Sequence, residues 1–180
     1  MLIKMDTLEA IVAGFSFFDT DVRNIYDNLK SKDKTINIIF VNSKLVYVLD
    51  HIRGILKIIN EEDKRKIKSI IKNVEIEFLL RICYTNQIEY AIKSNFGDTK
   101  NKNFVVVLIS KLEDKLGNIR DLLMPFGIEN SNLISPDDIK KDFILKYFFK
   151  DRFKGNYHLL LNNEEKYLKF FIEKAAISLN

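Results

Sequence analysis

The chain has 180 residues, of which 47% are hydrophobic and 30% charged, and its formal net charge is +4. This length suits one compact domain with a core of its own, and the composition excludes a disordered chain. No apolar run approaches the roughly 20 residues of a membrane span, and the first residues lack a basic segment followed by a secretory apolar core. We therefore expect a single domain over residues 1–180 that is soluble, cytoplasmic and without membrane contact.

The first part of the chain alternates apolar runs with helical periodicity. In chain order, the expected elements are a strand at residues 8–18, a helix that begins after Asp19-Thr20, a strand at residues 36–41, and a helix from Asn42-Ser43 to about Ile59. The second strand is apolar almost throughout, as in a strand buried on both faces. The sequence therefore predicts that the chain begins with a strand, a helix, a second strand and a second helix.

The rest of the chain is mainly helical in pattern, with one clear strand. Asn86 followed by Glu89 has the spacing of a capping box, so the interruption at residues 85–87 is expected to join two helices, the second ending at Gly97. The remaining expected elements are a central strand at residues 104–109, helices opened by Ser110 and by Ser135-Pro136, an edge strand at residues 157–161, and a final helix capped by Asn162 or Asn163. Strands separated by helices predict an α/β or α+β domain, with a small mixed or parallel sheet of about three to four strands covered by helices.

Residue types that carry chemistry are sparse. Neither His51 nor His158 has a further ligand at metal-binding spacing, so no metal site is expected. Cys83 is the only cysteine, which excludes an internal disulfide, and its apolar neighbours predict a buried, inert thiol. The sequence holds no glycine-rich phosphate loop and no nucleophile elbow. We therefore expect a protein that is not an enzyme and has no cofactor.

Two helices carry more apolar surface than a helix with one buried side needs. Before the junction, one side holds Ile76, Leu79, Leu80 and Cys83, and another holds Val74, Phe78 and Ile82 beside Arg81. In the final helix, one side holds Leu168, Phe171, Ile172, Ala175 and Leu179, and the opposite side holds Tyr167, Phe170 and Ile177. Either these helices are sandwiched within the domain, or their second faces receive a partner protein.

The segment EFLLRICYTNQIEYAIKSNFG, residues 77–97, resembles a pattern of the PRPK-binding protein family, the small kinase-associated subunit of the KEOPS complex. That pattern is Glu-x-Leu-Leu-x-Leu-small-Gly-x-Arg/Asn-Gln-Ile-x-x-Ala-Ile-x-x-x-x-Gly. The matching residues are Glu77, Leu79, Leu80, Cys83, Asn86, Gln87, Ile88, Ala91, Ile92 and Gly97. Tyr84 stands where the pattern has its first glycine. Looser similarity extends through DHIRGIL, FVVVLI and FIEKAAISL.

The resemblance implies a non-catalytic, regulatory subunit of the complex that makes threonylcarbamoyl-adenosine in tRNA. Its implied partners are the small RIO-like atypical kinase of KEOPS, which it binds and regulates, the single-stranded 3′ end of tRNA, which it helps to recruit, and, indirectly, the other KEOPS subunits. The kinase surface is expected on the final helix, at Tyr167, Leu168, Phe170, Ile172 and Ile177.

The RNA surface is expected to combine cations with an aromatic side chain, because unpaired bases stack while phosphates need positive charge. The residues expected there are Phe78, Arg81, Lys64, Arg65, Lys72 and Lys93. Asn86 and Gln87 either contact bases or, as structural residues, cap the helix and fix the turn. Compositional bias toward Lys, Ile and Asn would also explain the basic balance, without any polyanion.

A function of another class is a stand-alone regulatory domain that binds a small molecule in a pocket and has no role with nucleic acid. A defined pocket lined by convergent polar groups would favour this function. A flat apolar patch beside a separate basic patch would favour the adaptor.

Overall fold

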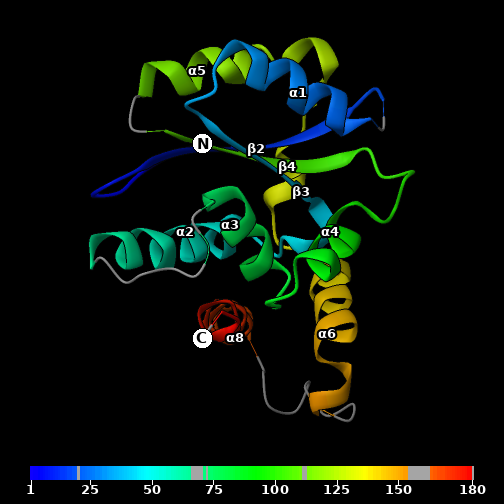
Figure 1. The fold of residues 1–180 in the computed structure, drawn as a ribbon. Coiled ribbons are helices and arrows are strands. Elements are labelled where there is room, and N and C mark those ends of the chain that lie inside the picture. Colours follow the sequence, from blue (N-terminus) through cyan, green and yellow to red (C-terminus); the bar gives the residue numbers. More distant parts are fainter. Residues whose placement is uncertain (20, 66–70, 72, 111–112, 154–162, 180) are drawn as a thin grey trace.

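The computed structural model of the protein describes residues 1–19, 21–65, 71, 73–110, 113–153 and 163–179 (Figure 1). Within these residues, five strands form one antiparallel sheet: β1 (Leu2–Lys4), β2 (Glu9–Phe17), β3 (Asn37–Asn42), β4 (Asn103–Ser110) and β5 (Gly127–Glu129). Their order is β1-β2-β4-β3, and β5 pairs with β2 beyond the part of β2 that pairs with β1. Strand β4 is therefore central, and β3 is an edge strand.

Helices cover both faces of the sheet. They are α1 (Val22–Lys32), α2 (Leu49–Lys64), α3 (Val74–Ile82), α4 (Ile88–Phe96), α5 (Glu113–Asp121), α6 (Asp138–Phe153) and α8 (Glu164–Ile177), with short 3-10 turns at Ser43–Leu45, Met124–Phe126 and Ser131–Ile134. Figure 1 shows α1 and α5 on one face and α2, α3 and α4 on the other, with α8 forming a further layer beneath α2 and α3. No helix in the described parts of the chain is both long and apolar enough to cross a membrane.

The expected mixed α/β class is confirmed, but the sheet has more strands than expected and all of its pairings are antiparallel. The expected strand-helix-strand start is present as β2, α1 and β3, but β2 and β3 are not neighbours in the sheet. Both β2 and β3 pair antiparallel with β4, so they run in the same direction with β4 between them. The apolar run of β4 suits this central place, since residues 104–110 are all buried.

Capping side chains explain where several helices begin. Asn163 accepts a hydrogen bond from the amide of Lys166 and caps α8, as expected. Asp21, rather than the expected Asp19-Thr20 pair, caps α1 by accepting from the amide of Asn24. The expected edge strand at residues 157–161 lies outside the described residues.

The segment after β3 departs from the expected continuous helix. The Asn42 side chain accepts from the amide of Lys44 and opens only a 3-10 turn, and α2 begins at Leu49. The expected capping box at the later junction is also absent, because α4 starts after Gln87 with no side-chain cap. Instead, Thr85 Oγ1 accepts from the amide of Gln87 at 3.2 Å. Asn86 is thus exposed and does not cap α4.

Two apolar layers make up the core. On β3 and β4, the even-numbered apolar residues pack under α1 and α5 on one face of the sheet. The odd-numbered ones pack against α2, α3 and Ala175 of α8 on the other face. A third cluster joins α6 to α8 through Ile144, Leu145, Phe149, Tyr167 and Phe171, together with Tyr47. Helix α8 is therefore held between α2 and α6, rather than lying as a single-sided helix on the surface.

Candidate functional site

The junction between α3 and α4 is built around Tyr84. Its φ of 51° lies in the left-handed region, where a residue with a side chain is strained by roughly 1–2 kcal/mol and a glycine is not. The family pattern that this segment resembles has glycine at the same position. Here the ring is packed instead, with centroids 5.2 Å from Phe148 and 4.9 Å from Phe149. Packing of the ring offsets the strain of the backbone.

His51 ties helix α2 to this junction. Its Nδ1 accepts from the amide of Tyr47 at 3.5 Å, and its Nε2 lies 3.0 Å from the hydroxyl of Tyr84. The ring is fully buried, and this burial lowers the pKa of His51 to about 3. His51 is therefore a neutral, packed histidine. Burial likewise raises the pKa of the Cys83 thiol to about 12, which confirms the expected buried cysteine.

Arg81 is the centre of a buried ionic network, with a side chain only 1% exposed. Its guanidinium lies 2.9 Å from Glu77 Oε1 and 2.7 Å from Glu62 Oε2. It also donates to the carbonyl oxygens of Ala175 and Ala176 at 3.1 and 3.3 Å. The network joins α2, α3 and the end of α8, so the second face of α3 is sandwiched inside the protein.

The expected RNA contact of Arg81 beside Phe78 is therefore wrong. Phe78 is 0% exposed, and the Arg81 guanidinium is bonded to the end of α8. Neither side chain offers a surface to a base or a phosphate. The periodicity of α3 indicated two apolar faces and left open whether the second is sandwiched or receives a partner. The structure shows that it is sandwiched.

Three of the other residues expected to bind RNA, namely Lys64, Arg65 and Lys93, are on the surface but not on one element. Lys64 and Arg65 at the end of α2 are exposed and already pair with Asp6 and Glu61, at 2.7 and 3.3 Å. Lys93 is exposed on α4. Lys72 lies outside the described residues. Figure 1 shows α4 and the end of α2 on opposite sides of the helical layer, so the fold does not gather these cations into one patch.

The residues expected to bind the kinase are divided by the packing of α8. Tyr167 is 5% exposed and belongs to the aromatic cluster with Phe171, so its assignment to an open face is wrong. Phe170 is partly buried, with its ring 5.1 Å from that of Phe149. Leu168 and Ile172 are half-buried, and Ile177 is 54% exposed. Ile177 therefore keeps the most apolar surface for a partner, and Leu168, Phe170 and Ile172 keep part of theirs.

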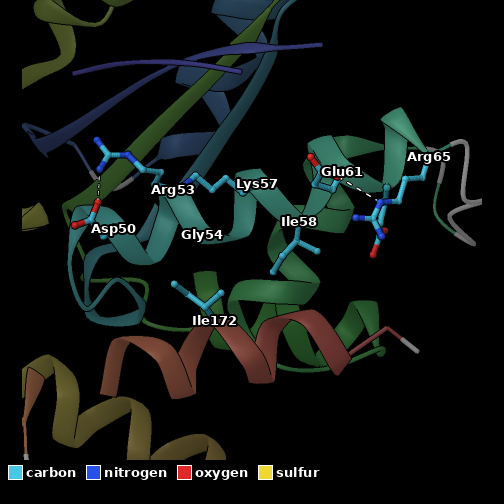
Figure 2. A pocket seen from close by; sticks show the side chains of 9 residues that line it. Asp50, Arg53, Gly54, Lys57, Ile58, Glu61, Arg65 and Ile172 are labelled. Carbon is cyan, nitrogen blue, oxygen red and sulfur yellow. Dashed lines mark hydrogen bonds and ion pairs between the residues drawn. The ribbon is translucent and has the colours of Figure 1, made fainter. Parts of the chain in front are cut away.

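A shallow groove of about 500 Å³ runs where α2 crosses α8 (Figure 2). Its apolar floor consists of Gly54, Ile58 and Ile172, and Figure 2 shows the two isoleucines extending toward one another from facing helices. A Cβ atom on Gly54 would lie 2.4 Å from Ile172 Cδ1, so only glycine admits this approach. We call this feature the α2–α8 groove.

Charged side chains flank the α2–α8 groove and largely compensate one another. Asp50 pairs with Arg53, Glu61 pairs with Arg65, and Lys57 is exposed between them (Figure 2). An apolar floor between charged rims is typical of a surface that receives a helix of another protein. Sequence reasoning did not single out Gly54 or Ile58. The available signal was a glycine inside a helical run, which often marks close approach of another element.

Within the described residues, no group of three or more His, Cys, Asp or Glu side chains could hold a metal ion. No family model matches the chain, and no curated protein matches it.

Proposed function

We propose that the chain is a non-catalytic subunit of the KEOPS complex, which makes threonylcarbamoyl-adenosine in tRNA. In this proposal it acts in the cytoplasm, binds and regulates the small RIO-like kinase of the complex, and helps to recruit tRNA by its single-stranded 3′ end. The resemblance of residues 77–97 to the PRPK-binding family motivates the proposal. The structural observation that supports it best is the α2–α8 groove, which suits docking of a protein helix.

The kinase surface in this proposal centres on Ile58 and Ile172. Both are half-buried in the free chain, and covering them would remove the rest of their apolar surface from water. Full burial of such a side chain contributes about 1.5–3 kcal/mol, so covering the third or less that is still exposed contributes less than about 1 kcal/mol for each. The charged rim contributes orientation more than affinity, since its pairs are exposed. Ile177, at the end of α8, lies outside the groove and lines a separate hollow with Tyr84 and Thr85, so it is not part of this surface.

The tRNA surface in this proposal relies on exposed cations rather than on Arg81. The pairs of Lys64 with Asp6 and of Arg65 with Glu61 are exposed to solvent. Exposed ion pairs contribute only about 0–1 kcal/mol, so these cations can exchange a carboxylate for a phosphate at little cost. Lys93 on α4 would provide a separate contact.

The proposal is tested by titrating the purified kinase with the wild-type chain and with Ile58→Lys. A lysine there would place a charge on the apolar floor, and we expect the Kd to rise at least about tenfold. Ile139→Lys is the matched control, because Ile139 is 80% exposed on α6 and lies outside the groove. Its Kd should equal that of the wild type. Circular dichroism checks that all three chains are folded. If they then bind the kinase with equal affinity, the groove is not the kinase surface.

A further inference from the structure

The edge strand β3 carries two backbone groups that have no hydrogen-bond partner among the described residues. In the pairing of β3 with β4, Ile39 lies opposite Val107. Because backbone hydrogen bonding alternates along a strand, the N–H and C=O groups of residues 38, 40 and 42 point away from β4. The amide of Ile38, the carbonyl of Phe40 and the amide of Asn42 all bond to side chains on that outer side. The Ile38 carbonyl and the Phe40 amide face the same way, and neither has a hydrogen-bond partner in the part of the chain that the structure describes.

Two anchored side chains close the strand edge on either side of this pair. Glu75 accepts from the amide of Ile38 at 2.9 Å and is itself held by Tyr26 and Lys30, at 2.8 and 2.7 Å. Asn95 is 0% exposed and holds both the Phe40 carbonyl and the Asn42 amide, at 2.7 and 2.8 Å. The open stretch is thus one acceptor and one donor wide. A further β-strand, which needs several successive groups, finds no room here.

This donor-acceptor pair lies at the bottom of a cleft of about 720 Å³ between α1, α3 and α4. Its inner walls include the apolar or aromatic residues Tyr26, Ile76, Leu79, Ile92, Phe96 and Phe104. Polar residues also line it, namely Asp21, Arg23, Glu75, Asp98, Thr99 and Asn101. Ile38 and Phe40 are only 2% and 4% exposed, so their backbone groups are largely shielded from water. Buried backbone groups without a partner are rare, and a ligand that bonds both would satisfy them.

We propose that this β3 cleft binds a small, flat, mostly apolar molecule that carries a hydrogen-bond donor and an acceptor on neighbouring atoms, as a cyclic amide does. The donor bonds to the Ile38 carbonyl, the acceptor bonds to the Phe40 amide, and the ring lies between the walls formed by α3 and α4. Apolar walls with a few convergent polar groups are typical of small-molecule sites. The inference does not depend on kinase or tRNA binding, because the α2–α8 groove and the β3 cleft share no lining residue.

Three flat lactams of increasing size, namely pyridone, isoquinolone and phenanthridinone, serve as probes in titrations followed by backbone amide NMR. We expect at least one to bind saturably and to shift the Phe40 amide signal. Its N-methyl derivative, which lacks the donor but keeps the ring, should bind about tenfold more weakly because the Ile38 carbonyl stays unpaired.

Two variants locate the binding. Ile92→Lys alters the wall at a residue that is 50% exposed, so the fold should tolerate it, and lactam affinity should fall severalfold. Ile139→Lys, outside the cleft, should leave the affinity unchanged. The proposal is overturned if none of the three lactams binds at millimolar concentration. It is also overturned if a lactam and its N-methyl form bind equally, or if the Phe40 amide signal does not move on saturation.

Discussion

Tyr84 combines a strained backbone with a packed side chain, and the balance can be measured. Tyr84→Gly removes roughly 1–2 kcal/mol of strain but also deletes a buried ring, which costs about 3–5 kcal/mol. We expect the free energy of unfolding to fall by about 2 kcal/mol in urea titrations. Tyr84→Phe keeps the ring and loses only the contact with His51, so it should cost about 1 kcal/mol. A Tyr84→Gly protein as stable as the wild type would show that the aromatic packing contributes little.

His51 makes the stability of the fold sensitive to acid. The folded chain protonates this ring only near pH 3, whereas the unfolded chain does so near its ordinary pKa of 6.5. Protons therefore bind the unfolded state preferentially between these values, and stability falls as the pH drops through that window. From pH 6.5 to pH 5 the expected loss from this group is between about 1 and 2 kcal/mol, because the slope approaches about 1.4 kcal/mol per pH unit only below the unfolded pKa.

The test compares the free energy of unfolding of wild type and His51→Gln at pH 7 and pH 5. The variant should start less stable and lose less on acidification, because it lacks the buried base. Parallel losses in the two proteins would mean that other groups set the acid response.

Among the helices, α2 and α8 cross at a distance that Gly54 sets. Gly54→Ala would raise helix propensity by about 1 kcal/mol, but its Cβ would overlap Ile172 Cδ1 and Cγ1 at 2.4 and 2.5 Å. Overpacking costs about 1–3 kcal/mol, so we expect net destabilisation. Ile172→Ala added to Gly54→Ala should recover part of that loss, in a double-mutant cycle measured by urea unfolding. Additive effects would contradict direct contact as the cause.

Arg81 joins three helices, and its removal should loosen α8 first. Arg81→Met removes the ion pair between Arg81 and Glu77, a residue that is only 4% exposed, and this should cost about 3–5 kcal/mol of unfolding free energy. Amide hydrogen exchange should rise most near Ala175 and Ala176, whose carbonyls lose the guanidinium. Glu77→Gln in the Arg81→Met background should restore part of the stability. No restoration would indicate that packing of the Arg81 stem, not charge, is what matters.

For the whole molecule, the proposed recruitment of tRNA gives a prediction that needs no residue assignment. With a net charge of +4, the chain should bind tRNA more weakly as salt increases. If the 3′ end is what it recognises, affinity should drop when the same tRNA is trimmed of that end, in titrations at two salt concentrations. Equal binding to both forms would show that the positive charge of the chain acts elsewhere on the tRNA. If no tRNA binds, only the part of the proposal in which the chain binds the kinase would remain.

Two surfaces on the molecule separate the two functions that the sequence allowed. The α2–α8 groove is shallow, apolar and rimmed by charge, as an adaptor requires. The β3 cleft is deeper set and holds two polar backbone groups, as a small-molecule regulatory domain requires. Because they share no residue, Ile58→Lys and Ile92→Lys test the two functions independently.

Several elements followed from sequence alone because their signals are local. The apolar run of residues 104–109 predicted a buried central strand, and Asn163 predicted the start of α8, since alternation and capping depend on near neighbours. The two-sided periodicity of residues 74–82 likewise indicated that α3 has two apolar faces, but not whether the second is covered by the chain itself or by a partner. The identity of the covering element had no local signal.

The sequence by itself therefore determined that the chain forms a mixed α/β fold with apolar strands, capped helices and a buried cysteine. Only the tertiary structure decided that β4 lies between β2 and β3, and that Arg81 points inward. The partners of Arg81 include Ala175, 94 positions away, and the partner of the Phe40 carbonyl is Asn95, 55 positions away. Periodicity reports which side of an element is apolar. It does not report what packs against that side, because those contacts form between residues far apart in the chain.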